Sequence, residues 1–507
     1  MKKRAPSRAA PTPPGRHAPV PPRRVPGEIA EQPAGAAHVF GRAQAGRPAW
    51  VVDGDELFRD GVRLAREGRL ADAVRKFDDL LRLAPDHADA LNDRGNALDL
   101  LRRRGEALES YERALRARPD HVHALNGRAN MLQAMGRQGE AIAGYDAALA
   151  IEPRYVHAWN GRGNALLALN RHEDALACYR RALALQPAHP DANFNEGLAS
   201  LALGDFETGW RQHEHRWSLP SWRARRRGFA QPLWLGAPDP RGKVVLLHAE
   251  QGFGDTLQFA RFVPRVAALG ARVVLEVQPA LRRLLAQLPG VETLCARGDA
   301  LPAFELHCPL LSLPLALGTA LDTIPPPEPP LRAAPEDVRR WDELLGPRDG
   351  RPRVGIAWQG NAGHDNDRAR SIPFERFAAL LDTACDFVSL QPQVSARDAP
   401  ALAACARVRR FDDRLRDFAD TAALVSHLDL VVAVDTSVVH LAGAMGRPAW
   451  VLLPWAADWR WLTGRADSPW YPHARLWRQP REGAWDEVLA DAARALAALA
   501  GSGRARR

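Results

Sequence analysis

The sequence predicts a helical repeat solenoid followed by an α/β module of two doubly wound lobes. Three observations lead to this fold class. From residue 54 to about 217, one residue pattern recurs every 34 residues. After residue 241, short apolar segments typical of buried parallel strands alternate with amphipathic helical segments. The proline-rich run 324–331 cannot lie inside a helix or a central strand, so it divides this alternation into two series.

Composition and charge narrow the class of protein. The chain has 507 residues and is 46% hydrophobic, which is enough for several cores. Its formal charge of +9 comes from the two ends: residues 1–50 carry nine Lys or Arg against two Glu, and three arginines lie among the last four residues. The part expected to fold is therefore close to neutral, which argues against a nucleic-acid-binding protein.

Cysteine usage and the chain start bear on the compartment. The five cysteines form no CxxC pair, so neither a disulfide framework nor a zinc site is expected. The basic start lacks the apolar segment of a signal peptide, and no run is long enough to span a membrane. We expect a cytoplasmic protein, with peripheral membrane contact left open. Residues 1–50, rich in Pro, Ala and Arg, predict a disordered basic tail.

Residues 51–220 contain the repeat. Helix-ending prolines, small residues where two helices cross, and aromatic residues that fill the gap between them keep the same step. They include Pro85, Pro119, Pro153 and Pro187; Gly61, Gly95, Ala129, Gly163 and Gly197; and Phe77, Tyr111, Tyr145 and Tyr179. Period and pattern resemble the tetratricopeptide repeat. Four full repeats are expected, with a fifth, irregular unit as a cap or joint.

Asparagine pairs recur on the first helix of the three middle repeats, on the face expected to be concave. They are Asn92 with Asn96, Asn126 with Asn130, and Asn160 with Asn164. Members of a pair lie one helical turn apart, and amides both donate and accept hydrogen bonds, so the series could hold an extended peptide. A solvated polar face with local caps explains the same pattern. Both interpretations stay open.

Residues 221–241 predict a linker and residues 242–332 the first lobe. Its first strand runs into a Gly-Phe-Gly-Asp turn and then a helix. Gly252 and Gly254 would allow a phosphate or sugar to approach the backbone, and Asp255 could act as a general base toward an acceptor hydroxyl. A tight turn with Asp255 as helix N-cap explains the same residues, and spacing alone favours it.

Residues 333–500 predict the second lobe and contain the main candidate site. The buried strand 430–434 runs without a spacer into Asp435, Thr436 and Ser437, and then into a helix. Backbone N–H groups and the helix dipole at such a turn attract anions, and His440 flanks it. In open α/β sheets, ligands bind beyond the carboxyl ends of the strands. The turn therefore predicts a site for the diphosphate and sugar of a nucleotide-sugar donor.

Further polar and aromatic residues are expected at the same edge. Gln359 and Arg370 lie in a long polar loop after a strand, and Gln391 ends another strand. An arginine suits a diphosphate, whose charge grows as the sugar–phosphate bond breaks. The same loop also carries Asn361, His364, Asn366 and Arg368. Tryptophans 455, 459 and 461 could stack on a base or sugar, but packing between the lobes is favoured for at least two of them.

Three motifs together carry a family resemblance. DTSVVHLAGAMGRP at 435–448, GFGDTLQF at 252–259 and RSIP at 370–373 resemble the heptosyltransferase-type glycosyltransferases of family 9. These have the GT-B fold of two Rossmann-like lobes. With the repeats, the chain resembles bacterial proteins that fuse tetratricopeptide repeats to such a module. The overall plan is similar to O-linked N-acetylglucosamine transferase.

The resemblance implies roles for matching residues. Asp255 would be the catalytic base, and Arg370 takes the place of a lysine that neutralises donor phosphate. Asp435 would touch the donor sugar, with Thr436, Ser437 and His440 completing the turn. Ser437 stands where heptosyltransferases commonly have glycine, so the donor sugar stays open. The resemblance also implies a metal-independent enzyme without a cofactor.

Two functions follow from the sequence. One is a glycosyltransferase that moves a sugar from a nucleotide-sugar donor to a protein or cell-surface glycan recruited by the repeats. The other is a non-catalytic interaction scaffold with a degenerate transferase-like module. Nucleic-acid binding through the basic tail is disfavoured because the remainder of the chain is neutral.

Overall fold

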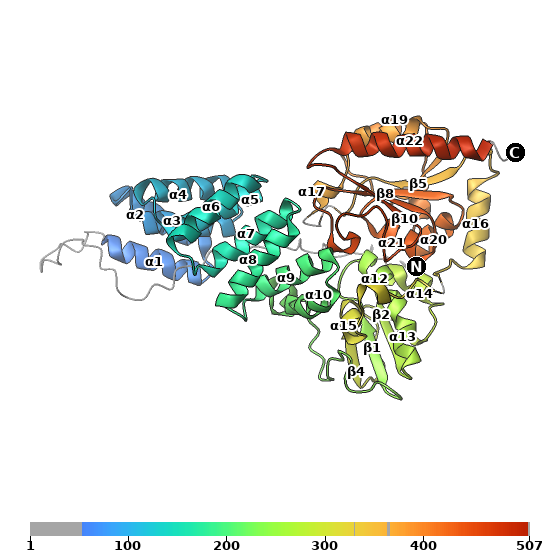
Figure 1. Cartoon of the computed structure of the whole chain (residues 1–507), viewed down its shortest axis with the longest axis horizontal. Helices are drawn as coiled ribbons and strands as arrows, with labels where there is room; N and C mark the ends of the chain where they lie inside the picture. The colour runs from blue at the N-terminus through green and yellow to red at the C-terminus, as the bar shows by residue number, and fades with distance from the viewer. Residues whose placement is uncertain (1–52, 329, 362, 364–365, 505–507) are drawn as a thin grey trace, which may run out of the picture.

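The computed structural model describes residues 53–504, apart from 329, 362, 364 and 365. The predicted tail, residues 1–50, and His364 therefore lie outside the described residues. Figure 1 shows an elongated stack of helices that joins, at its C-terminal end, a body of two α/β lobes. The predicted fold class, a repeat solenoid followed by two lobes with parallel sheets, is confirmed.

The solenoid consists of antiparallel helix pairs. The first helices of the five pairs are α1 (Gly54–Arg66), α3 (Ala88–Leu100), α5 (Val122–Ala134), α7 (Val156–Ala168) and α9 (Pro190–Leu203). The second helices are α2 (Leu70–Leu83), α4 (Arg104–Ala117), α6 (Gln138–Ile151), α8 (His172–Leu185) and α10 (Phe206–His213).

The repeat pattern has the packing role that its residue types predict. A Cβ built on Gly61 would lie 2.5 Å from the Phe77 ring, and one on Gly163 would lie 2.5 Å from the Tyr179 ring. Glycine therefore lets the aromatic side chain of the second helix press against the first. Helices α2, α4, α6 and α8 each end two residues before a repeat proline, which cannot continue a helix.

The first lobe contains a four-stranded parallel sheet with strand order β3-β2-β1-β4. Its strands are β1 (Val244–His248), β2 (Arg272–Val277), β3 (Val291–Ala296) and β4 (Leu306–Pro309). Its helices are α12 (Phe253–Phe259), α13 (Val263–Ala268), α14 (Arg282–Leu285) and α15 (Leu313–Ala316). Before this lobe, the predicted linker contains the short α11 (Pro220–Arg223), and its Trp234 is buried.

The second lobe contains a six-stranded parallel sheet with strand order β10-β9-β8-β5-β6-β7. Its strands are β5 (Arg353–Ala357), β6 (Asp386–Ser389), β7 (Val408–Arg409), β8 (Leu430–Val434), β9 (Ala449–Leu453) and β10 (Ala474–Arg478). Its helices are α16 (Pro335–Leu345), α17 (Asp367–Arg370), α18 (Phe374–Phe377), α19 (Ala399–Ala404), α20 (Phe418–Ser426), α21 (Ser437–Ala444) and α22 (Trp485–Arg504). Helix α22 runs along the side of this lobe that faces away from the first lobe (Figure 1).

Some predicted elements differ from the observed ones. The pattern predicts one helix over 256–269, but α12 ends at Phe259 and α13 starts at Val263, with a 3-10 turn between them. Pro264 explains the break because its ring cannot continue the preceding helix but suits a helix start. Strands β3, β7 and β10 are not predicted from the sequence. Strands β7 and β10 lie at the edges of the second sheet and β3 at an edge of the first, where alternating polar residues weaken the apolar pattern.

One apolar core joins the last repeat to both lobes. It includes Trp210 of α10, Phe259 of α12, and Val439 of α21. The Trp210 ring lies 5.3 Å from Trp459 and 6.3 Å from Phe259, measured between ring centroids. The fifth repeat is therefore packed against the two lobes at the place where they meet.

Candidate functional site

The turn between β8 and α21 has the geometry of an anion site. Thr436 is the N-cap of α21 in an extended conformation, and its side chain makes no capping hydrogen bond. The Thr436 hydroxyl is buried, and it has no hydrogen-bond partner among the described residues. A helix N-terminus with open N–H groups and a spare hydroxyl can accept a phosphate.

Asp435 and His440 flank this turn. His440 Nε2 lies 3.7 Å from Asp435 Oδ1, and His440 Nδ1 lies 2.9 Å from the Tyr471 hydroxyl. The imidazole is stacked on Trp461, with ring centroids 5.5 Å apart. Burial opposes ionisation of Asp435, but His440 and Arg370 outweigh it and hold the pKa of this carboxyl below its ordinary value. Asp435 therefore presents a negative charge beside the helix start.

Arg370 reaches the same turn from α17. Its Nη1 donates to the main-chain oxygen of Asp435 at 2.9 Å, and its Nε lies 3.5 Å from Asp367 Oδ1. Gly360 makes this reach possible because a Cβ there would lie 2.6 Å from Arg370 Nη2. Arg370 is one of the residues predicted from the sequence, whereas Gly360 is not.

The glycine-containing turn of the first lobe meets α21. Gly252 is the N-cap of α12, and its N–H donates to Asp255 Oδ2 at 2.8 Å. Asp255 thus caps the helix from its third position and not as the predicted N-cap residue. A Cβ on Gly254 would lie 2.7 Å from His440 Cδ2. Packing between the lobes accounts for the close approach at Gly254, and its predicted contact with a donor stays a prediction.

Arg460 connects the two lobes and is absent from the sequence-based site. Its Nη2 donates to Asp255 Oδ1 of the first lobe, and its Nη1 donates to Asp458 Oδ1 at 2.8 Å. Its guanidinium lies 4.3 Å from the Trp459 ring centroid. Burial disfavours the charged guanidinium, but Asp458 and Asp255 outweigh it and raise the pKa of Arg460 above its ordinary value. The sequence pattern of this segment draws attention to the tryptophans on either side of Arg460 and gives no sign of its distant partner Asp255.

Gln359 and Gln391, two further predicted donor contacts, differ from each other in their hydrogen bonds. Gln359 Nε2 donates to the Gln393 carbonyl at 3.2 Å, and its Oε1 accepts from Ser395 N at 3.4 Å, so it holds the loop after β6. The Oε1 atom of Gln391 is buried without a hydrogen-bond partner in the described part of the chain. Neither side chain makes a hydrogen bond to Asp435 or Asp255 there. Their predicted contact with a donor stays a prediction.

Two of the three tryptophans between β9 and β10 pack against other buried side chains. Trp459 contacts Trp210 and Trp461 stacks on His440, and both are buried. Trp455 is half-buried. The favoured interpretation, packing at the junction for at least two of the three, agrees with this arrangement.

The asparagine series lies inside the solenoid. The second member of each pair accepts a hydrogen bond from a repeat tyrosine: Tyr111 to Asn96 at 2.7 Å, Tyr145 to Asn130 at 2.6 Å, and Tyr179 to Asn164 at 2.8 Å. Asn92, Asn126 and Asn160 are buried, so a freely solvated face does not describe them. The Oδ1 atoms of Asn92 and Asn126 have no partner within the described residues, whereas Asn160 Oδ1 accepts from Asn195 at 3.0 Å.

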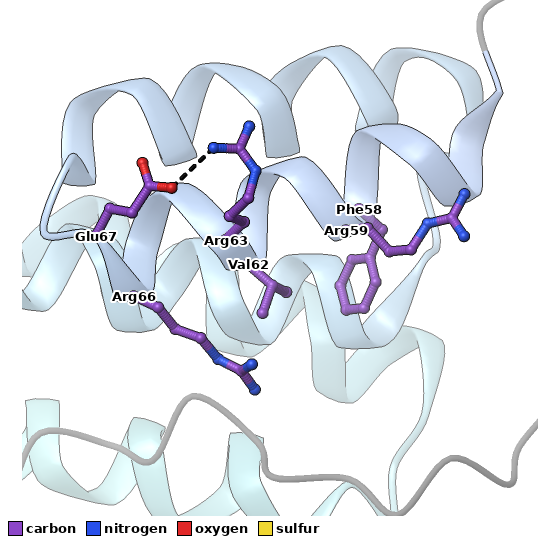
Figure 2. Close-up of a pocket in the computed structure, with 6 residues that line it drawn as sticks. All are labelled: Phe58, Arg59, Val62, Arg63, Arg66 and Glu67. Carbon is purple, nitrogen blue, oxygen red and sulfur yellow. Dashed lines mark hydrogen bonds and ion pairs between the residues drawn. The ribbon is translucent and has the colours of Figure 1, made fainter.

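A cavity lies at the opposite end of the molecule. Its volume is about 420 Å³, and α1 and its C-cap residue Glu67 line it. The lining residues are Phe58, Arg59, Val62, Arg63, Arg66 and Glu67 (Figure 2). Arg63 and Glu67 form an ion pair of 2.9 Å. This cavity belongs to the first repeat and contains none of the predicted site residues.

The described part of the chain has neither a metal-binding cluster nor a membrane-spanning helix. Within residues 53–504, with the gaps given above, no three His, Cys, Asp or Glu side chains are grouped to hold a metal ion. None of the described helices is long and apolar enough to cross a membrane. The five cysteines are all free thiols.

Comparison with known protein families identifies the repeats. Residues 59–103 and 101–156 match one tetratricopeptide-repeat family, and residues 156–189 match a second. The chain contains tetratricopeptide repeats. Solved structures similar to them include MamA (17% identical, 33% of this chain and 97% of that one, TM-score 0.28), and PilW, a type IV pilus biogenesis factor (24% identical, 33% and 78%, TM-score 0.31).

A curated relative extends further along the chain. Protein FlbA of Caulobacter vibrioides is 29% identical over 328 residues, which cover 59% of this chain and 54% of that protein. The chain thus spans about half the length of this relative. The covered share of this chain exceeds residues 1–241, so the similarity reaches into the α/β module. The name FlbA states no activity.

Proposed function

We propose that the chain is a glycosyltransferase that takes a sugar from a nucleotide-sugar donor. The observation that carries the proposal is the meeting of the two lobes at Arg460. This guanidinium pairs with Asp255 of the first lobe, while Asp435 of the donor turn is a further carboxylate in its electrostatic surroundings. A base candidate and an anion-binding turn are thus held at one place by different lobes.

The residues suggest how the transfer would proceed. The donor diphosphate would bind at Thr436 and Ser437, with Arg370 beside it. Asp255 would take the proton of an acceptor hydroxyl while the acceptor oxygen forms a bond to the anomeric carbon of the sugar. The bond between that carbon and the phosphate oxygen breaks, and its electron pair leaves with the nucleoside diphosphate. The turn amides would stabilise this leaving group.

The repeats would recruit the acceptor as a protein or peptide. Tetratricopeptide solenoids bind partners on their concave surface. The side chains of Asn92 and Asn126 are buried, so they would have to turn outward for their carbonyl oxygens to accept hydrogen bonds from the N–H groups of an extended peptide. A cytoplasmic location and the absence of a metal requirement belong to the same proposal.

Donor binding and transfer test the proposal separately. A panel of nucleotide sugars is screened by thermal shift, and at least one should raise the melting temperature. With that donor, Asp255→Asn should lower the transfer rate by about 10²–10⁴-fold while the thermal shift persists. Asp239→Asn, an exposed carboxylate of the linker, is the matched control. Full transfer activity in Asp255→Asn would remove Asp255 from the base role.

A scaffold without catalysis is the second candidate. It is favoured by the continuous core between the lobes and by the ion pair that occupies Asp255. If the protein is such a scaffold, no nucleotide sugar of the panel should raise its melting temperature. Peptides that bind the repeats should raise it.

A further inference from the structure

We propose that Arg460 is a switch that passes from the Asp255 carboxylate to the diphosphate of the donor, so that donor binding frees Asp255 to act as the base. The inference rests on the proposed transferase function and adds a residue and an order of events to it. It follows from what Asp255 and Arg460 each contact.

Both carboxylate oxygens of Asp255 are engaged. Oδ2 accepts from the N–H of Gly252 at 2.8 Å, and Oδ1 accepts from Arg460 Nη2. An acceptor hydroxyl must donate to one of these two oxygens before its proton can be taken. It can approach Oδ1 only after Arg460 has moved away from Asp255.

Arg460 is placed to reach a donor. It belongs to the segment between β9 and β10, and its side chain is 11% exposed. Its surroundings include the Asp435 carboxylate of the donor turn as well as Asp255 and Asp458. The Nη1 contact with Asp458 can anchor the guanidinium while Nη2 changes partner. One guanidinium can donate to two phosphate oxygens at once, so a diphosphate is a suitable new partner for Arg460.

The negative charge of a bound diphosphate would attract Arg460 away from Asp255. The charges of Asp255, Asp435 and Asp458 all act on Arg460, and a dianionic diphosphate at the turn would add a further anion beside it. Arg370 at the turn already contacts the Asp435 carbonyl and Asp367. A diphosphate would therefore compete with Asp255 for Arg460. The base would become available only once the donor is in place.

The experiment is a double-mutant cycle on ligand binding, measured by calorimetry with inorganic pyrophosphate and with UDP as probes. The four proteins are the full-length chain, Asp255→Asn, Arg460→Met and the double variant. Arg460→Met should weaken binding by about tenfold or more. Asp255→Asn should tighten binding about three- to tenfold, because the competitor for Arg460 is gone, and this gain should vanish in the Arg460→Met background.

Other outcomes would overturn the inference in distinguishable ways. An equal gain from Asp255→Asn in both backgrounds would mean general charge repulsion and no switch. Unchanged binding by Arg460→Met would likewise refute the switch while leaving the transferase function standing. If the unmodified chain binds neither probe nor any nucleotide sugar, the proposed function falls with it. If Arg460→Met fails to fold, the same four-protein cycle is repeated with Arg460→Lys. Lysine keeps the positive charge but cannot contact two phosphate oxygens as a guanidinium does.

Discussion

Gly254 of the first lobe and His440 of the second are in such close contact that a Cβ on the glycine would lie 2.7 Å from the imidazole Cδ2. The two residues belong to α12 and α21, the helices that follow the first strand of one sheet and the central β8 of the other. Their contact fixes His440 beside Asp435 and the turn between β8 and α21. A glycine in a motif suggestive of phosphate binding thus serves the fit between lobes.

Replacing Gly254 by alanine should therefore disturb the lobe junction. The added methyl group must displace the His440 ring, which is itself held between Trp461 and the Tyr471 hydroxyl. We expect a loss of about 1–3 kcal/mol in the free energy of unfolding, measured by urea denaturation. Gly139→Ala is the control: a Cβ there meets nothing within 4 Å, and alanine favours its helix. Equal effects of the two substitutions would contradict the assigned contact.

Trp210 should couple the solenoid to the lobes. It is buried, packs against Phe259, Trp459 and Trp470, and donates through Nε1 to the Thr319 carbonyl at 3.0 Å. Trp210→Ala should cost about 3–5 kcal/mol. It should also separate repeat and lobe unfolding into two transitions in calorimetry. Trp210→Phe, which keeps most of the ring, should cost less. A single unshifted transition in the alanine variant would refute this coupling.

Asp93 should make the stability of the repeats depend on pH. Burial raises the pKa of this carboxyl to about 7, more than its hydrogen bonds from Asn92 and Asn96 lower it. A pKa raised in the folded state gives stability that is full below about pH 4 and is lost as pH rises through about 7. Asp93→Asn should match the parent near pH 4 and exceed it at pH 8 by on the order of 2–4 kcal/mol.

Chemical denaturation at a series of pH values measures this difference. Asp60→Asn is the control because Asp60 is only half-buried and its pKa is lowered by Arg63, which gives the opposite direction. A pH-independent difference between Asp93→Asn and the parent would show that Asp93 is not ionised on the way to pH 8.

Asn126 and Asn160 occupy equivalent positions but should respond differently to alanine. Asn160 Oδ1 accepts from Asn195, whereas Asn126 Oδ1 has no partner among the described residues. Both substitutions remove the same atoms, so the difference reports the hydrogen bond. Asn160→Ala should lose about 1–2 kcal/mol more in urea denaturation than Asn126→Ala. Equal losses would mean that the Asn126 oxygen has an internal partner and is not available to a peptide.

The repeat domain could be predicted closely from the sequence. A period of 34 residues fixes which positions meet, because each helix pair contacts mainly its neighbours. Gly61 against Phe77 and Gly163 against Tyr179 follow from residue size alone. The period does not show which asparagine carbonyl oxygens accept a hydrogen bond within the solenoid. Asn195, outside the three predicted pairs, decides that one carbonyl oxygen is occupied while two remain spare.

The candidate site could be predicted only in part. Asp435, Thr436 and Ser437 follow directly from a strand that runs into a helix, a local pattern. Arg460 could not be found in this way. Its partner Asp255 lies 205 positions earlier in the sequence. No local spacing connects an arginine of the second lobe with a turn of the first. Gly360 is similar, since its role depends on where Arg370 passes.

The sequence by itself determined the order of solenoid and lobes, the strand-to-helix turns and the residue types at each turn. These depend on periodicity and on neighbours within a few positions. Only the tertiary structure decided that Gly254 packs on His440 and that Asp255 is paired with Arg460. It also decided that Trp210 ties the fifth repeat to both lobes. Such contacts arise when two lobes bury a shared apolar surface, and the residues that meet there are set by the packing of whole elements.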